Sequence, residues 1–446
     1  MNSLRKETES EAGLSVEDLQ ETWRILAPED RLEAFFDLPR AEAEDFFLDL
    51  SALDEYVLIA LMPAQQRRSW LRLLPPDDAA DVVQACEEPA ERDEFLALLD
   101  EPTRNEVTAL LAYAEDDAGG LMSTRYARVR PDVTVDEAIA YLRRQGRDKL
   151  EHVNYVYVLE ADQALVGVVS LRDMFTAAPG RTIRDLMDTQ VITARDDMDQ
   201  EALGRLFAQH DLQAIPVVDA AGRMQGIVTV DDIVDVIQEE ATEDIQKIGG
   251  VEALDEPYLR ITLPRLLKKR VGWLAALFLS EMLTTTAMAK FEAEISRAVV
   301  LAIFIPLIIS SGGNSGSQAS TLVIRAMALG EVKLTDWWRV INRELATGLM
   351  MGVVLGVIGF GRVVLWHYLF QAYGPHYLYV AMTIGFSVIG VVMWGTLSGS
   401  MLPFALRRFG LDPASASAPF VATLVDVTGI VIYFSIASFI LRGTLL

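Results

Sequence analysis

Five long apolar segments follow one another in the carboxy-terminal part of the chain and constrain its fold more than any other feature. They cover residues 271–289, 298–323, 345–370, 378–405 and 414–441. Each is long enough to cross the hydrocarbon core of a bilayer as a helix, which takes about 20 residues. Residues 264–446 are therefore predicted to form a membrane domain of five spanning α-helices.

Lys and Arg between these segments predict the orientation of the membrane domain. They gather before the first segment, between the second and third, and between the fourth and fifth, whereas residues 367–377 after the third contain none. Because basic loops stay in the cytoplasm, the amino terminus is predicted inside and the carboxy terminus outside. The first 20 residues lack the apolar core of a signal peptide, which agrees with this orientation.

The remaining part of the chain is strongly acidic. Residues 1–263 carry 25 of the 39 Lys and Arg and 56 of the 64 Asp and Glu, a net charge of −31. Such a body repels nucleic acid and attracts cations, although acidity that serves solubility alone is an equal alternative. The single cysteine, Cys86, excludes an intrachain disulfide and a cysteine-based zinc cluster.

Polar residues interrupt two of the apolar segments. Asp426 lies near the middle of the fifth, where a carboxylate is costly and by default functional. The second contains twelve consecutive small or polar residues, 310–321, with Asn314 and Gln318 among them. Two adjacent glycines there are expected to weaken the helix and expose carbonyl groups along a hydrophilic path, with close helix packing as the alternative.

The candidate ligands are all oxygen atoms, which favours Mg²⁺, Ca²⁺ or Mn²⁺ over Zn²⁺ or Cu⁺. One membrane carboxylate per chain suits a largely hydrated Mg²⁺, although this reasoning does not separate it from Ca²⁺. A symmetric dimer would bring two copies of Asp426 together on one axis. A further acid, Glu281 in the first segment, either lines the same path or pairs with Arg362.

Residues 1–120 are predicted to form a superhelical domain of short helices, because prolines punctuate short amphipathic segments. Asp77 and Asp81 lie one turn apart there and either complement a helix dipole or form half of a cation site. A second acidic stretch, residues 235–244, opens a helix predicted over 233–262. Its carboxylates either form a solvated face or repel one another until a divalent cation binds.

Residues 121–245 contain an internal repeat that resembles a pair of cystathionine-β-synthase (CBS) modules of α/β fold, over 121–186 and 187–245. Each copy opens with Leu-Met and closes with Gly-x-x-[Ser/Thr]-x-x-Asp, at 167–173 and 226–232. In such modules the hydroxyl and carboxylate can hold a ribose, so an adenine nucleotide such as ATP is a possible ligand. The candidates are Tyr155, Ser170, Arg172 and Asp173, with helix capping by Ser170 and Asp173 as the alternative.

The order of these parts, with Gly312-Gly-Asn-Ser-Gly-Ser-Gln318 in the second span and Asp412-Pro-Ala…Asp426-Val-Thr-Gly429 in the fifth, resembles the MgtE family of magnesium channels. The resemblance implies a homodimer in a bacterial inner membrane, with a pore between the subunits that cytoplasmic Mg²⁺ closes. It assigns 246–263 to a connecting helix before the membrane domain. Ser317 departs from the family, whose members often have Asn there.

Carried over residue by residue, the resemblance implies a pore site and a set of regulatory sites. The pore residues are Asp426, Asn314 and Asp412. The regulatory residues are Asp77, Asp81, Asp199, Glu201, Asp211, Asp232, Glu240, Glu243 and Asp244. At low Mg²⁺, the −31 charge of each soluble part would push the modules apart.

No phosphate-binding loop (Gly-x-x-x-x-Gly-Lys) occurs in the sequence, so no chemical fuel is expected. The protein is expected to be a transporter and not an enzyme. The expected function is Mg²⁺ influx down its electrochemical gradient, with membrane lipid and Mg²⁺ as partners and no nucleic acid. The alternative is an ion-coupled exchanger or exporter of Mn²⁺, Co²⁺ or Ca²⁺, in which Asp426 and Glu281 form a coupling pair.

Overall fold

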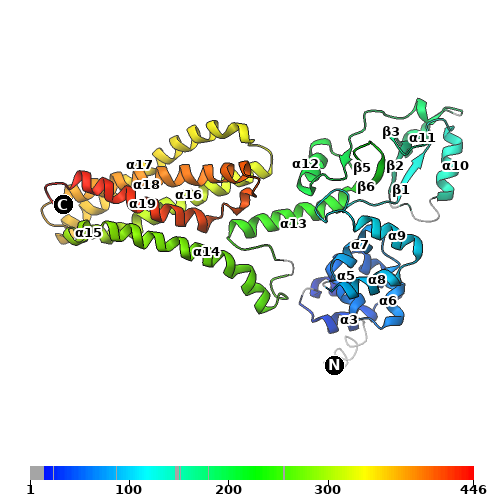
Figure 1. Cartoon of the computed structure of the whole chain (residues 1–446), viewed down its shortest axis with the longest axis horizontal. Helices are drawn as coiled ribbons and strands as arrows, with labels where there is room; N and C mark the ends of the chain where they lie inside the picture. Colours follow the sequence, from blue (N-terminus) through cyan, green and yellow to red (C-terminus); the bar gives the residue numbers. More distant parts are fainter. Residues whose placement is uncertain are drawn as a thin grey trace, which may run out of the picture. The chain divides into compact units, whose positions relative to one another are not determined.

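The computed structural model describes residues 15–23, 25–86, 88–145, 150, 152–178, 180–254 and 257–445. The chain divides into two compact units, Met1–Gln238 and Glu239–Leu446 (Figure 1). Residues 1–14 of the predicted amino-terminal domain lie outside the described residues. The predicted fold class is confirmed: a helical domain, two α/β modules and five long apolar helices occur in that order.

The amino-terminal domain consists of short helices that begin at caps or prolines. Ser15 forms a capping box with Asp18, and proline occupies the first turn of four later helices, where its missing N–H is not needed. The helices are α2 (Val16–Thr22), α3 (Pro28–Phe36), α4 (Arg40–Leu48), α5 (Ala52–Leu61), α6 (Ala64–Leu71), α7 (Pro76–Gln84), α8 (Pro89–Leu98) and α9 (Glu101–Leu110).

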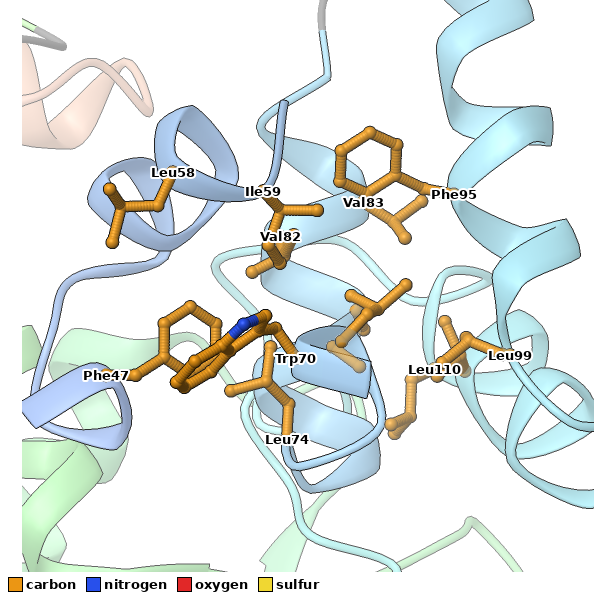
Figure 2. Packing of buried hydrophobic residues seen from close by; sticks show 14 of the residues in the cluster. Phe47, Leu58, Ile59, Trp70, Leu74, Val82, Val83, Phe95, Leu99 and Leu110 are labelled. Atoms are coloured by element: carbon orange, nitrogen blue, oxygen red, sulfur yellow. The ribbon is translucent and has the colours of Figure 1, made fainter. Parts of the chain in front are cut away.

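Aliphatic and aromatic side chains, among them Phe47, Trp70 and Phe95, fill the core of this helical domain (Figure 2). The ring of Trp70 lies 4.8 Å from that of Phe35 and 5.2 Å from that of Phe47, centroid to centroid. The same hydrophobic cluster continues into the second CBS module through Leu203 and Phe207. The helical domain and this module therefore share one core, which fixes the acidic start of α7 against the module.

The two CBS modules have the same topology, as the repeat predicts. Each has a three-stranded sheet whose first two strands are parallel and whose last two are antiparallel. The first contains β1 (Tyr126–Val129), α10 (Val135–Gln145), β2 (His152–Leu159), β3 (Leu165–Ser170) and α11 (Leu171–Thr176). The second contains β4 (Ala194–Arg195), α12 (Gln200–His210), β5 (Ala214–Val218), β6 (Met224–Thr229) and α13 (Val230–Ile248).

The repeated methionines and glycines of the two modules contact each other crosswise. A Cβ atom added to Gly226 would lie 2.8 Å from Cγ of Met122, and one added to Gly167 would lie 2.9 Å from Sδ of Met187. Each glycine therefore makes room for the methionine that opens a copy of the repeat. Packing alone thus explains these two positions of the repeat.

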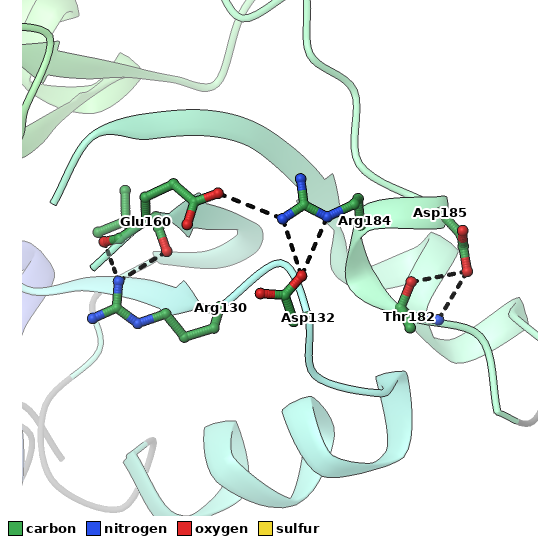
Figure 3. Close-up of polar contacts among 7 residues, drawn as sticks. Arg130, Asp132, Glu160, Thr182, Arg184 and Asp185 are labelled. Carbon is green, nitrogen blue, oxygen red and sulfur yellow. Dashed lines mark hydrogen bonds and ion pairs between the residues drawn. The ribbon is translucent and has the colours of Figure 1, made fainter. Parts of the chain in front are cut away.

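Polar contacts hold the end of the first module, around residues 182–185, against the rest of that module (Figure 3). Arg184, in the 3₁₀ turn η1 (Ile183–Asp185), pairs with Asp132 at 3.0 Å and Glu160 at 3.5 Å. The guanidinium of Arg130 donates to the backbone carbonyl of Glu160. Each of these exposed ion pairs contributes about 0–1 kcal/mol to the free energy of folding. Their main effect is therefore on the orientation of η1.

The helix that leaves the second module is shorter than predicted. We expected a helix over 233–262 and a connecting helix over 246–263, but α13 ends at Ile248. Gly249 and Gly250 follow, and Gly250 has a φ of +74°, a left-handed conformation that ends a helix. The prediction was wrong because two consecutive glycines, the second of them left-handed, end the helix although acidic residues at helical spacing precede them.

The membrane unit contains the five predicted spans, each long and apolar enough to cross a bilayer. The helices are α14 (Leu263–Lys290), α16 (Ile305–Ala328), α17 (Trp337–Phe370), α18 (Tyr377–Arg408) and α19 (Ala418–Ile440). A short helix, α15 (Glu292–Arg297), and a 3₁₀ helix, η2 (Val299–Phe304), connect α14 to α16, and η3 (Leu334–Asp336) precedes α17. A 3₁₀ turn, η4 (Pro413–Ser415), precedes α19.

Candidate functional site

Asp426 lies in α19 with its side chain partly exposed. The carboxyl group of Glu281 in α14 is within hydrogen-bonding reach of it. Arg362, the other partner considered for Glu281, instead donates to the hydroxyl of Tyr373 at 3.1 Å. Two carboxyl groups this close are not both charged at low cost unless a proton or a cation lies between them.

A polar stripe runs along α16 on the exposed side of the helix. Ser310, Asn314 and Gln318 are all exposed and follow one another at intervals of four residues, so they lie on one face. Nδ2 of Asn314 lies 3.5 Å from Oγ of Ser310. Within a bilayer, polar groups that face lipid have no partner and are costly, so this face must meet water or another protein surface.

The packing of α16 against α19 fixes the depth of this stripe. A Cβ atom added to Gly312 would lie 2.8 Å from Val425, and one added to Gly316 would lie 2.7 Å from Val421. The two helices therefore run antiparallel.

In this register, Asn314 lies at the level of the residues between Val421 and Val425. The level of Asn314 is thus about one helical turn, roughly 5 Å, from that of Asp426. The structure packs the second and fifth spans against each other and places Asn314 and Asp426 at similar depth.

The glycines of the second span serve close packing. We expected them to weaken the helix, but α16 is continuous. The carbonyl groups of Gly312 and Gly316 contact α18 at Gly395 and Gly399 so closely that no side chain fits there. Ser317 donates a hydrogen bond to the carbonyl oxygen of Ala418 at 3.2 Å, so this departure from the family supports the same packing.

Asp412 lies before α19, and both of its carboxylate oxygens have partners. Oδ1 accepts a hydrogen bond from the backbone N–H of Ala414 at 2.8 Å, which caps η4. Oδ2 lies 2.7 Å from Nζ of Lys247, which also lies 2.5 Å from Oε1 of Glu243. Sequence analysis missed Lys247, although its position four residues after Glu243 is a recognisable signal for an ion pair.

Lys247 is charged at any physiological pH. Burial acts to lower its pKa, but hydrogen bonds and charge interactions with Asp412 and Glu243 outweigh burial and raise the pKa above its usual value. The other predicted acids of this helix, Glu240 and Asp244, are partly buried on the same stretch of α13.

A second group of acids lies where the helical domain packs on the second CBS module. Asp77, Asp78 and Asp81 open α7 and interact electrostatically with Asp232 near the start of α13. Oδ2 of Asp232 accepts a hydrogen bond from the hydroxyl of Thr229 at 2.5 Å. The structure therefore brings together three predicted residues from two domains, and it adds Asp78.

Burial and mutual repulsion raise the pKa values of this acidic cluster, which consists of Asp77, Asp78, Asp81 and Asp232. Burial, followed by the charge of Asp232, raises the pKa of Asp77 to about 6. Burial, followed by the charges of Asp77 and Asp232, raises the pKa of Asp78 to about 7. Burial, followed by Asp78, also raises the pKa of Asp81. A cation bound here would relieve this repulsion.

Glu55 in α5 extends this cluster, and sequence analysis missed it. Its side chain is only 2% exposed, and burial followed by the charges of Asp78 and Asp81 raises its pKa to about 9. Glu55 is therefore protonated at neutral pH. In the sequence, Glu55 cannot be distinguished from any other acid in the first turn of a helix. Its burial arises only when α5 packs against α7.

The other three predicted regulatory acids do not converge. Asp199 caps α12 and accepts a hydrogen bond from the backbone N–H of Glu201, whose own carboxylate pairs with Arg205 at 2.6 Å. Asp211 ends the same helix at φ 51°. The two groups are thus separated by the length of α12, about 16 Å.

The predicted nucleotide residues lie together on the first CBS module. Tyr155 pairs with Ser170 between β2 and β3, and Ser170 caps α11. Oγ of Ser170 lies 2.6 Å from Oδ2 of Asp173 and accepts the backbone N–H of Asp173 at 3.0 Å. Arg172 is exposed beside them. The capping alternative is therefore confirmed, and the hydroxyl and carboxylate remain exposed.

Within the described ranges, no group of three or more His, Cys, Asp or Glu side chains is arranged to hold a metal ion directly. Direct coordination by a full set of side chains is thus not preformed in this part of the chain. An ion that keeps most of its water and needs only one or two carboxylates, as Mg²⁺ does, is compatible with this arrangement.

Five apolar helices, acids within them and a soluble unit with CBS modules define a multi-pass membrane transporter with an attached soluble domain. Family models agree: "Divalent cation transporter" matches residues 305–436, "MgtE intracellular N domain" matches 14–116, and "CBS domain" matches 118–180 and 183–239.

The chain is 40% identical over 429 residues to the magnesium transporter MgtE of Thermus thermophilus, covering 96% of this chain and 93% of the relative. It is 35% identical to the magnesium transporter MgtE of Enterococcus faecalis, covering 76% and 72%. The chain therefore belongs to the MgtE family of magnesium transporters, as the sequence motifs indicate. A solved structure of the cytosolic domain of the Mg²⁺ channel MgtE in complex with ATP is 40% identical, with a TM-score of 0.47, covering 50% of this chain and 90% of that one.

Proposed function

We propose that this protein is a Mg²⁺ channel that lets Mg²⁺ enter the cytoplasm down its electrochemical gradient. The polar stripe of α16 beside Asp426 carries the proposal, because such a surface in the middle of apolar spans needs water or a partner. The relatives that are magnesium transporters support Mg²⁺ as the ion. A membrane potential favours entry by about 2.3 kcal/mol per charge per 100 mV, and a divalent ion gains twice that.

A homodimer within the lipid bilayer would place two polar stripes and two copies of Asp426 face to face. Asp426 and Asn314 would then hold Mg²⁺ largely through its water shell, and Asp412 would lie nearer the cytoplasmic mouth of the same pore. The topology expected from the basic loops gives cytoplasmic soluble domains and an external carboxy terminus, in the inner membrane of a bacterium.

Cytoplasmic Mg²⁺ would close the channel by binding to acids of the soluble domains. The acidic cluster is the best-supported site, because its carboxylates lie close enough to repel one another and a bound cation would relieve that repulsion. The remaining candidates are Asp199, Glu201, Asp211, Glu240, Glu243 and Asp244. Asp199 and Glu201 are separated from Asp211 by the length of α12, and Glu240, Glu243 and Asp244 lie on one helix, so a second subunit or a rearrangement would have to complete these sites.

An adenine nucleotide such as ATP is the proposed ligand of the first CBS module. The hydroxyl of Ser170 donates to Oδ2 of Asp173, and this pair lies at an exposed edge, with Tyr155 and Arg172 beside it, where it could turn to a ribose. In the equivalent pair of the second module, Thr229 and Asp232, the carboxylate belongs to the acidic cluster, so this pair is expected to bind no nucleotide.

The test is Mg²⁺ uptake into a host that requires added Mg²⁺. Asp426→Ala should abolish selective uptake, because the only acid of α19 is then lost. Glu292→Ala, which removes an exposed acid outside the five spans, should transport like the wild type. Undiminished and equally selective uptake by Asp426→Ala would refute the pore assignment.

The contact between Asp426 and Glu281 favours a second candidate, an exchanger that couples divalent-cation export or exchange to protons. A proton shared by the two carboxyl groups would be released when a cation binds. Flux through an exchanger should reverse with an imposed pH gradient, whereas flux through a channel should follow voltage and the Mg²⁺ gradient.

A further inference from the structure

Lys247 lies between two acids that the family resemblance assigns to Mg²⁺. Its ammonium group is 2.7 Å from Oδ2 of Asp412 and 2.5 Å from Oε1 of Glu243. All three side chains are about one-third exposed. Charge-assisted hydrogen bonds of this length are the stronger kind in proteins.

Asp412 and Glu243 could each bind another cation through the same oxygen only by giving up their contact with Lys247. The second oxygen of Asp412 already accepts the N–H of Ala414, so both oxygens are engaged. Glu243 and Lys247 lie one turn apart on α13, in the favourable order with the acid first. A Mg²⁺ ion bound directly to Oδ2 of Asp412 would have to displace the ammonium group.

Packing within the membrane unit holds the end of α13 in this position. Ile248 packs against Ile324, Ala414 and Ala416 at the end of the spans. The backbone at Gly250 lies so close to Trp273 that an added Cβ atom would be 3.0 Å from the indole ring. Lys247 is thus held beside Asp412 by its neighbours in sequence.

We propose that Lys247 is a built-in cation that links Glu243 to Asp412 and holds the end of α13 on the membrane unit without Mg²⁺. A covalently attached ammonium group has a local concentration that does not change with cytoplasmic Mg²⁺. The contact therefore persists when Mg²⁺ is withdrawn. Glu243, one of the proposed regulatory acids, would then respond to Mg²⁺ only where Lys247 is displaced, and Mg²⁺-dependent changes would start in the acidic cluster.

Only the consequence for gating rests on the proposed function. The link itself can be tested without measuring transport. Backbone hydrogen exchange of residues 243–250 is measured in the full-length protein in lipid nanodiscs, with Mg²⁺ and with a chelator. In the wild type, exchange should be equally slow in both conditions. In Lys247→Met, which keeps the length of the side chain, exchange in chelator should rise about tenfold, because two unneutralised carboxylates then face each other.

Three further variants keep the test decisive. Mg²⁺ should restore slow exchange to Lys247→Met, since the two acids are then available to it. Adding Asp412→Asn to Lys247→Met should restore slow exchange in chelator, because the repulsion is removed. Lys247→Arg and the exposed control Lys268→Met should both behave like the wild type.

Two results would overturn the proposal. One is an equal rise of exchange in chelator for the wild type and Lys247→Met, which would mean that Mg²⁺ already bridges the two acids. The other is wild-type protection in Lys247→Met without Mg²⁺, which would make the lysine irrelevant. Failure of the proposed transport would instead appear in the uptake assay with Asp426→Ala, whatever the exchange data show.

Discussion

Asp78 offers the sharpest test of the acidic cluster, because it can be neutralised with little change of shape. Its pKa is about 7, against 3.8 for an ordinary aspartate, through burial and then the charges of Asp77 and Asp232. A pKa raised in the folded state contributes stability at low pH, and this stability is lost as the pH rises through the folded-state pKa. Asp78→Asn should therefore stabilise the soluble unit above pH 7 and have little effect near pH 4.

The pKa difference sets the upper limit of the effect. About three pKa units correspond to about 4 kcal/mol at pH 8. The side chain is not fully buried and its neighbours relax, so we expect about 1–2 kcal/mol. For a unit the size of Met1–Gln238, this is an increase in Tm of about 2–8 °C.

The assay is thermal unfolding of the full-length protein in detergent at pH 5 and pH 8, with and without Mg²⁺. Wild-type protein should gain more from Mg²⁺ at pH 8 than at pH 5, since the acids are then charged, and Asp78→Asn should lose part of that gain. Asp93→Asn, an exposed change on α8, is the matched control and should change nothing. A variant that is equally stable or less stable than wild type at pH 8 would refute the electrostatic reasoning.

Three further outcomes are expected. Trp70→Ala should lower the free energy of unfolding of the soluble unit by about 3–5 kcal/mol in chemical denaturation, whereas Trp337→Ala, half-exposed, should not. Gly395→Val should abolish monodisperse protein in size-exclusion chromatography, because no Cβ atom fits there, whereas Gly361→Val has open space and should be tolerated. Ser170→Ala should remove a helix cap worth about 1 kcal/mol and weaken ATP binding in calorimetry.

Length and composition were enough to predict the membrane domain. A run of some 20 apolar residues has few stable alternatives to a spanning helix, so all five spans were found. The CBS pair was predicted because its repeat reflects packing, with Gly167 and Gly226 leaving room for methionines. The end of the helix that leaves the second module was predicted less well. Acidic residues at helical spacing continue to Asp244, and only Gly249 and Gly250 mark where the helix ends.

The candidate site was predicted in part. Asp426 is recognisable because its cost depends only on its place in an apolar run. Glu55 and Asp78 could not be found, because their raised pKa values depend on burial between elements far apart in sequence. Lys247 lies just after the acidic stretch of residues 235–244, and its second partner, Asp412, is 165 positions further along the chain. The sequence therefore does not reveal that the two residues pair.

The distribution of acids changes how the charge of −31 should be understood. Exposed charges more than about 8 Å apart are largely screened at physiological salt, so most of the soluble unit's acids repel one another weakly. The half-buried carboxylates of Asp77, Asp78, Asp81 and Asp232 are screened less, and burial, with repulsion by neighbouring carboxylates after it, raises their pKa values. Under the proposed function, Mg²⁺ sensing would therefore depend on this half-buried cluster more than on net charge, and removing exposed acids should leave it intact.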